Sequence, residues 1–133
     1  MGRSRAELNF NRLQKLAGMS LEELTADHKA FKVKSEGFMD LSIETHPHLS
    51  TESYRVVSLT HYYEQNGDLV PDPDMMIRVY LDRKTVEPAT FQDSYRFQEV
   101  YLEGNRWRPQ LAKELSSFLA TWLVNLKKQG FYK

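Results

Sequence analysis

Between residues 31 and 101 the chain alternates apolar and polar side chains, and this period of two constrains the fold more than any other feature. Val, Tyr, Phe, Ile and Thr are enriched in the alternating runs, and Gly, Pro, Asn and Asp cluster between them. Such runs are typical of antiparallel strands with one buried face and one face open to water. We therefore predict five or six antiparallel strands, over residues 30–35, 38–46, 54–64, 75–82, 85–91 and 95–102. The acidic stretch 64–74 is predicted as a loop, with a turn at Asn66-Gly67.

The N-terminal segment shows the helical period of 3.6 instead. Ser4 and Glu7 form a capping-box pair at the start of a first helix, and Gly18 ends it. Ser20 and Glu23 repeat the pairing and predict a short second helical turn. The apolar face of the first helix consists of Phe10, Leu13, Leu16 and Ala17.

The last 25 residues return to the helical period. Pro109 suits the first position of a helix and Gly130 suits the residue after its end. Between them lies one wide apolar stripe, formed by Leu111, Leu115, Phe118, Leu119, Trp122, Leu123 and Leu126. We predict an α+β fold over a single domain, residues 1–133. In this predicted fold, the N-terminal helix and the long C-terminal helix pack on one face of a curved antiparallel sheet.

The composition excludes several classes of function. The 133 residues include 18 Lys or Arg and 18 Asp or Glu, so the chain lacks the surplus positive charge that nucleic-acid binding needs. It has no Cys, which excludes disulfides and thiolate nucleophiles and fits a reducing cytosol. No apolar run approaches the ~20 residues of a membrane span, and no phosphate-binding loop or nucleophile elbow occurs. We expect a cytoplasmic protein, monomeric or homodimeric, with no cofactor.

One strand carries the main candidate for a functional surface. In the fourth predicted strand, alternation places Arg78, Tyr80 and Asp82 on one face, and the opposite face is apolar. If residues 83–84 form a two-residue hairpin loop, Glu87 pairs with Tyr80 and joins the same polar face. A three-residue loop would instead place Glu87 on the opposite, apolar face of the sheet.

The last predicted strand adds Arg96 to the polar face. The aromatic residues that alternate with it are predicted on the core side: Tyr95, Phe97 and Tyr101. Two interpretations of the polar face remain open. In the first, it is a solvated sheet face with cross-strand ion pairs, each worth a few tenths of a kcal/mol. In the second, it is a concave anion or peptide site in which Arg78 and Arg96 clamp a charge that Tyr80 orients.

Glu44, His46 and His48 have the only metal-like spacing in the chain. Two imidazoles and a carboxylate suit zinc or iron. Pro47 leaves the directions of the two rings uncontrolled, and no third His follows closely, so we expect a polar turn there and no metal. His61 alternates within a strand, and we predict a half-buried, hydrogen-bonded side chain in preference to a general base.

Four segments, in this order and spacing, resemble the YqiB-like family of bacterial proteins of unknown function, and the resemblance spans nearly the whole chain. They are Leu8-Asn9-Phe10 with Leu13 and Leu16, Arg78-Val79-Tyr80-Leu81-Asp82 with Glu87, Tyr95-Arg96-Phe97, and Phe118-Leu119-Ala120-Thr121-Trp122-Leu123. Residues 61–68 and 98–101 are similar to an uncharacterised domain of bacterial mobile elements. The resemblance implies a bacterial cytoplasmic protein and supplies no catalytic residues. Many relatives have His where this chain has Leu81, so any chemistry of that His is absent here.

Three functions remain open after this reading of the sequence. The first is a non-catalytic binding or adaptor module that presents the polar sheet face to a protein partner. The second is the binding of a small anionic metabolite, and the third is an enzyme. A metabolite site would use Arg78, Tyr80 and Arg96, and an enzyme would use Asp82, Glu87 or His61.

Overall fold

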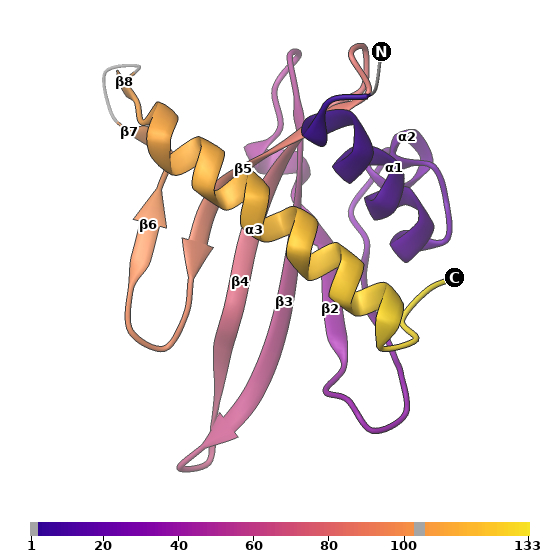
Figure 1. Cartoon of the computed structure of the whole chain (residues 1–133), viewed down its shortest axis with the longest axis vertical. Coiled ribbons are helices and arrows are strands. Elements are labelled where there is room, and N and C mark those ends of the chain that lie inside the picture. The colour runs from indigo at the N-terminus through magenta and orange to yellow at the C-terminus, as the bar shows by residue number, and fades with distance from the viewer. Residues whose placement is uncertain (1–2, 103–105) are drawn as a thin grey trace.

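A six-stranded antiparallel sheet that stays open forms the centre of the computed structural model, which describes residues 3–102 and 106–133 (Figure 1). The six strands lie in chain order across the sheet, so each strand pairs with its sequence neighbours. Their bounds are β1 (Ala30–Val33), β2 (Leu41–Thr45), β3 (Arg55–Gln65), β4 (Asp68–Tyr80), β5 (Thr85–Gln92) and β6 (Phe97–Glu99). The predicted antiparallel sheet is confirmed.

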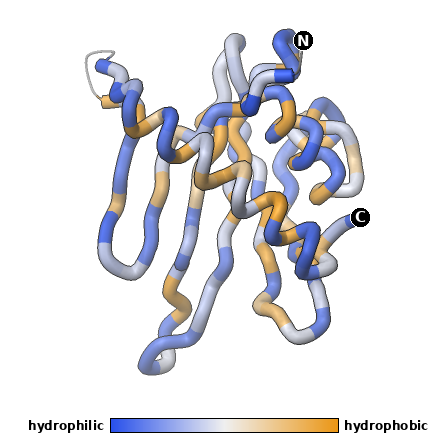
Figure 2. The backbone as a smooth tube through the Cα atoms, in the orientation of Figure 1, coloured by the Kyte–Doolittle hydropathy of each residue, from blue (hydrophilic) through white to orange (hydrophobic). Residues whose placement is uncertain are grey.

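The prediction of a loop over residues 64–74 is wrong, because β3 and β4 continue through this stretch as a long hairpin. Only Asn66 and Gly67 form the turn, with φ of 54° and 85°. Pro71 and Pro73 are tolerated because β4 pairs with β5 only from Asp74 onward, so this part of β4 lies at an edge. The hairpin tip extends beyond the core, and its turn is hydrophilic (Figure 2). The apolar residues Leu69 and Val70 are adjacent, so this stretch lacks the alternation that marks a strand.

The predicted strand 95–102 is also divided differently. Tyr95 and Arg96 belong to the turn after β5, where the Asp93 carboxylate accepts hydrogen bonds from both backbone N–H groups, at 2.8 and 2.9 Å. This turn changes which residues face the core. Tyr95 and Phe97 are 93% and 55% exposed, so their predicted core positions are wrong. After β6, the strand β7 (Tyr101–Leu102) pairs with β8 (Arg106–Trp107) in a separate two-stranded sheet.

The helices begin and end where their capping residues predict. Helix α1 (Arg5–Ala17) has the Ser4 capping box and ends at Gly18, and the single-turn helix α2 (Leu21–Leu24) is capped by Ser20. Helix α3 (Pro109–Lys128) lies diagonally across the sheet (Figure 1). Buried Asn9 on α1 donates to the carbonyl oxygen of Ser116 on α3, at 3.3 Å, which links the two helices.

The core lies between the helices and one face of the sheet. It includes the buried side chains Leu13, Leu16, Ile43, Leu59, Met75, Ile77, Val86, Leu119, Leu123 and Leu126. The α+β fold, with both terminal helices on one side, is therefore confirmed. None of the helices in the described residues is long and apolar enough to span a membrane. We call the opposite face of the sheet, which carries Ser58, Thr60, Arg78 and Glu87, the outer face.

Candidate functional site

Arg78 lies on the outer face, in β4, between Val56 of β3 and Glu87 of β5. The grouping of Arg78, Tyr80 and Glu87 on one face is as predicted, but their pairing is not. Asp82, predicted on the same strand face, lies beyond the end of β4. Tyr80 pairs with Thr85, because the β4–β5 connection has four residues, 81–84, and Lys84 adopts φ of 54°. The longer connection shifts the register by two residues, so Glu87 lies opposite Arg78 and the parity of the face is kept.

Two tyrosine rings hold the guanidinium group of Arg78. Its Cζ atom lies 3.6 Å from the ring centroid of Tyr101 and 4.2 Å from that of Tyr54. Both rings thus contact the guanidinium at cation–π distance. The electron-rich rings stabilise the positive charge. The edge of the guanidinium, which carries the N–H groups, is left for hydrogen bonding.

Glu87 positions Tyr101 and does not neutralise Arg78. The Tyr101 hydroxyl donates to Glu87 Oε2 at 2.7 Å. Burial, and then this hydrogen bond, raise the pKa of Tyr101, so the phenol stays protonated. Within residues 3–102 and 106–133, no carboxylate lies within the 4.0 Å ion-pair distance of Arg78.

The stacking continues along the outer face. The ring of Tyr80 lies 5.9 Å from that of Tyr54, and Arg83 Cζ lies 4.2 Å from the Tyr80 ring. Tyr80 is only 8% exposed, so it packs beneath this arrangement and does not present its ring to a ligand. We call the run of Tyr101, Arg78, Tyr54, Tyr80 and Arg83 the arginine–tyrosine stack.

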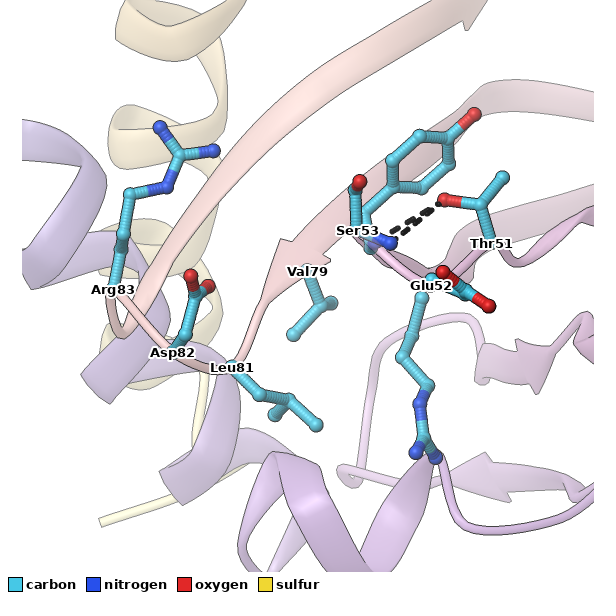
Figure 3. A pocket seen from close by; sticks show the side chains of 9 residues that line it. Thr51, Glu52, Ser53, Val79, Leu81, Asp82 and Arg83 are labelled. Atoms are coloured by element: carbon cyan, nitrogen blue, oxygen red, sulfur yellow. Dashed lines mark hydrogen bonds between the residues drawn. The ribbon is translucent and has the colours of Figure 1, made fainter.

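Two hollows adjoin the stack, and Tyr54 lines both of them. The first, the Arg78 hollow, has a volume of about 590 Å³ and is lined by Tyr54, Arg78, Glu99, Tyr101, Leu102, Arg106 and Trp107. The second, of about 630 Å³, lies between residues 51–55 and residues 79–83. Asp82 and Arg83 form one wall of this second hollow, and Thr51, Glu52 and Ser53 form the other (Figure 3). The hydroxyl of Thr51 accepts hydrogen bonds from the backbone N–H groups of Ser53 and Tyr54 and orders that wall.

The structure does not bring Arg96 to Arg78. Arg96 lies in the turn after β5, where its Nε atom is 3.7 Å from Asp93 Oδ2 and its Cζ atom is 5.8 Å from the ring of Phe91. Phe91 is buried and packs against Phe118 of α3, on the helix side of the sheet. The predicted clamp of two arginines is therefore not formed.

The three residues proposed for catalysis lie apart. Asp82 is exposed in the β4–β5 connection, and Glu87 is on the outer face. His61 is half-buried on the helix side, with its ring 5.8 Å from that of Trp122 and 6.0 Å from that of Phe131. Its Nδ1 atom lies 3.1 Å from the carbonyl oxygen of Asp40. His61 is thus the hydrogen-bonded residue that its strand position predicts.

The side chains with metal-like spacing have other partners. Glu44 Oε2 lies 3.2 Å from His28 Nε2, and His46 Nε2 lies 2.8 Å from Ser58 Oγ. The rings of His46 and His48 are 6.0 Å apart. Over the described part of the chain, no three His, Asp or Glu side chains are arranged to hold a metal ion.

Six of the seven residues that line the Arg78 hollow were not predicted as part of the site: Tyr54, Glu99, Tyr101, Leu102, Arg106 and Trp107. Tyr101 was assigned to the core side, because the Asp93 turn and the break after β6 were not visible in the alternation. Tyr54 comes from the segment before β3, and only the pairing of β3 with β4 brings it to Arg78. The one available signal was the surplus of Tyr in the chain, seven residues, beside arginines in neighbouring strands.

One family matches residues 8–132, and its description is a domain of unknown function, DUF6908. The chain belongs to the DUF6908 family. This match confirms that the family is an uncharacterised one, but it does not extend to the YqiB-like family or to the domain of mobile elements. No curated protein and no solved structure matches the chain significantly. DUF6908 therefore supplies no catalytic or binding residues, and function has to be argued from the site.

Proposed function

We propose that this DUF6908 protein is a non-catalytic binding module that recognises an anionic group of its partner on the outer face, with Arg78 as the anchor. One observation carries the proposal. Arg78 is half-buried between two aromatic rings, lines a hollow, and has no carboxylate at ion-pair distance in the described residues. The resemblance to bacterial families supports a bacterial cytoplasmic setting.

The physical argument concerns the charge on Arg78. A partly buried cation loses hydration, and in most proteins a carboxylate compensates for this loss. Here Glu87, the residue opposite Arg78 in the sheet, accepts the Tyr101 hydroxyl. The two rings offset part of the cost and fix the plane of the guanidinium. A fixed, unneutralised fork of N–H groups is suited to a carboxylate or phosphate that binds through two oxygens.

The alternative of a solvated face with cross-strand ion pairs has less support. The four ion pairs among the described residues join His28 to Glu44, Lys29 to Asp27, Lys34 to Asp40 and Arg96 to Asp93. None of them uses Arg78, Asp82 or Glu87. Cross-strand attraction thus does not explain why these charges share the outer face.

The other two functions are less well supported by the geometry. A metabolite clamp of Arg78 and Arg96 would need the two guanidinium groups on one surface. Arg78 contacts Tyr101 on the outer face, whereas Arg96 lies in the turn after β5, beside Asp93 and Phe91. An enzyme based on Asp82, Glu87 or His61 would have to use one of them alone, since no pair among them is close.

Thermal unfolding in the presence of simple anions tests the proposal. Inorganic phosphate, citrate and acetate are titrated against the wild type, Arg78→Ala, Arg78→Lys and the control Arg96→Ala. At 100 times its dissociation constant, a bound anion stabilises the fold by roughly 2.7 kcal/mol. We expect stabilisation of the wild type and of Arg96→Ala, its loss in Arg78→Ala, and its reduction in Arg78→Lys, which keeps the charge but not the fork. Equal responses from all four proteins would contradict the proposal.

A further inference from the structure

We infer that the Arg78 hollow binds an α-carboxylate together with the neighbouring N–H group and an apolar or aromatic side chain. This is the shared chemistry of a free amino acid and of the last residue of a peptide. The inference rests on the proposed function and names the class of ligand for the same site. Three lining residues carry it: Arg78, Glu99 and Trp107.

The carboxylate position follows from the way Arg78 is held. Tyr54 and Tyr101 contact its guanidinium at cation–π distance, so we expect an anion to approach the N–H edge, in the plane of the group. A planar carboxylate in that plane makes two parallel N–H···O bonds. Because Glu87 holds the Tyr101 hydroxyl at 2.7 Å, the ring on one side is fixed before any ligand arrives.

Glu99 gives the hollow an acceptor of the opposite charge. It lies on β6, paired with Thr90, and its backbone carbonyl accepts a hydrogen bond from Arg108 Nη1 at 3.4 Å, so the main chain there is held. Among the described residues its carboxylate makes no hydrogen bond or ion pair. A carboxylate in the hollow attracts an N–H or ammonium group and repels a second negative charge. Because Arg78 and Glu99 line the same hollow, the ligand class we infer carries both an anionic group and a donor.

Trp107 supplies the apolar part of the hollow. It is 58% exposed, which is unusual for the largest aromatic side chain, and it pairs with Tyr101 across the β7–β8 sheet. Leu102 lines the same hollow. A volume of about 590 Å³ falls within the roughly 300–1,000 Å³ range of small-molecule sites. An aromatic or large aliphatic side chain beside the carboxylate would cover the exposed indole.

Calorimetric titration with defined probes tests this inference on the full chain. The probes are free phenylalanine, a pentapeptide ending in Phe with a free carboxylate, the same peptide with a C-terminal amide, and inorganic phosphate. We expect saturable binding of at least one free carboxylate, and about tenfold or greater weakening by the amide, since a charge-assisted hydrogen bond is lost. Stronger binding of the peptide than of the free amino acid would identify a peptide end as the source, and the reverse would identify the amino acid.

Two variants separate the parts of the recognition. Glu99→Gln should weaken the binding of free phenylalanine about tenfold and leave the affinity for phosphate unchanged or higher, because a repulsive charge is removed. Trp107→Ala should weaken the binding of the peptide ending in Phe and have little effect on the binding of a peptide ending in Gly. Arg96→Ala, whose guanidinium is paired with Asp93, serves as the matched control and should bind every probe like the wild type.

The outcomes distinguish this inference from the proposed function. If phosphate binds in an Arg78-dependent manner and neither carboxylate probe does, the ligand class is wrong and the anion site stands. Equal binding of the acid and amide peptides also overturns the ligand class. If no probe binds and thermal unfolding shows no response to any anion, both the ligand class and the anion site are wrong.

Discussion

At the scale of single residues, the Arg78 site depends on a hydrogen bond that does not involve Arg78. The Tyr101 ring contacts the guanidinium, and its hydroxyl donates to Glu87 on β5. The interaction is half-buried, and burial raises the pKa of Tyr101, so the donor stays protonated at neutral pH. Tyr101 and Glu87 are therefore positioning residues, which hold the ring so that the fork of Arg78 points into the hollow.

Replacing Tyr101 with Phe tests this role. The variant keeps the ring but leaves the Glu87 carboxylate without its donor, so we expect a loss of about 1 kcal/mol in the free energy of unfolding. Urea denaturation measures it, and Tyr95→Phe is the matched control, because the Tyr95 side chain is 93% exposed and should lose nothing measurable. Equal stability of the two variants would show that the Tyr101 hydroxyl does not hold the ring.

His46 makes the stability of the fold depend on pH. Burial lowers the pKa of His46 from its ordinary value of 6.5. The unfolded chain therefore takes up a proton at this residue before the native state does, and the contribution of His46 to stability is lost as the pH falls below about 6.5.

We expect the free energy of unfolding, measured in urea between pH 7.5 and pH 5, to fall less steeply in His46→Gln than in the wild type. The other three histidines are common to both proteins, so the difference between the curves isolates His46. Parallel curves would show that His46 is not desolvated in the native state.

At the scale of elements, the β3–β4 hairpin depends on its two-residue turn. Asn66 and Gly67 both have positive φ, as a turn of mirror-image type requires, and both strands of the tip project beyond the core. Gly67→Ala places a Cβ atom on left-handed backbone and should cost roughly 1–2 kcal/mol. Thermal unfolding checks this value against Gln65→Ala, an exposed substitution next to the turn, which should be nearly neutral.

Helix α3 is the element that closes the core. Trp122 is 8% exposed and packs beside His61 and Phe118, so Trp122→Ala should cost roughly 3–5 kcal/mol. The adjacent exposed substitution Thr121→Ala should change the free energy of unfolding by less than about 0.5 kcal/mol. Calorimetry measures both. A Trp122→Ala protein that melts like the wild type would contradict the packing of α3 on the sheet.

Elements that bury a face could be predicted from the sequence, and elements outside the core could not. The stripe of α3 predicts that helix because all of its members except Phe118 are buried, and the capping pair of α1 predicts where the first helix begins. The hairpin tip has no buried face, so residues 64–74 lack alternation although they are strand. The Asp93 turn exposes Tyr95 and Phe97 through two side-chain hydrogen bonds, which aromatic character alone does not indicate.

At the scale of the whole molecule, the helices cover one face of the sheet and leave the outer face to present its side chains. Strand alternation predicts that Arg78 and Glu87 share this face, because the four-residue connection keeps the parity of the predicted two-residue loop. The neighbours of Arg78 could not be predicted, since Tyr54 and Tyr101 come from segments on opposite sides of β4 in the chain. The positions of Tyr54 and Tyr101 depend on the register of the neighbouring strands, and the lengths of the connecting turns set that register.

The most direct test of the anion site is an NMR titration that follows the Arg78 Nε–H resonance of the ¹⁵N-labelled wild type as acetate or inorganic phosphate is added. The Arg96 Nε–H resonance in the same spectra is the internal control, because its guanidinium is paired with Asp93. Binding at the Arg78 hollow predicts a saturable shift of Arg78 with at least one anion and a much smaller, non-saturating change at Arg96. Equal, linear changes at both arginines would contradict a site at Arg78.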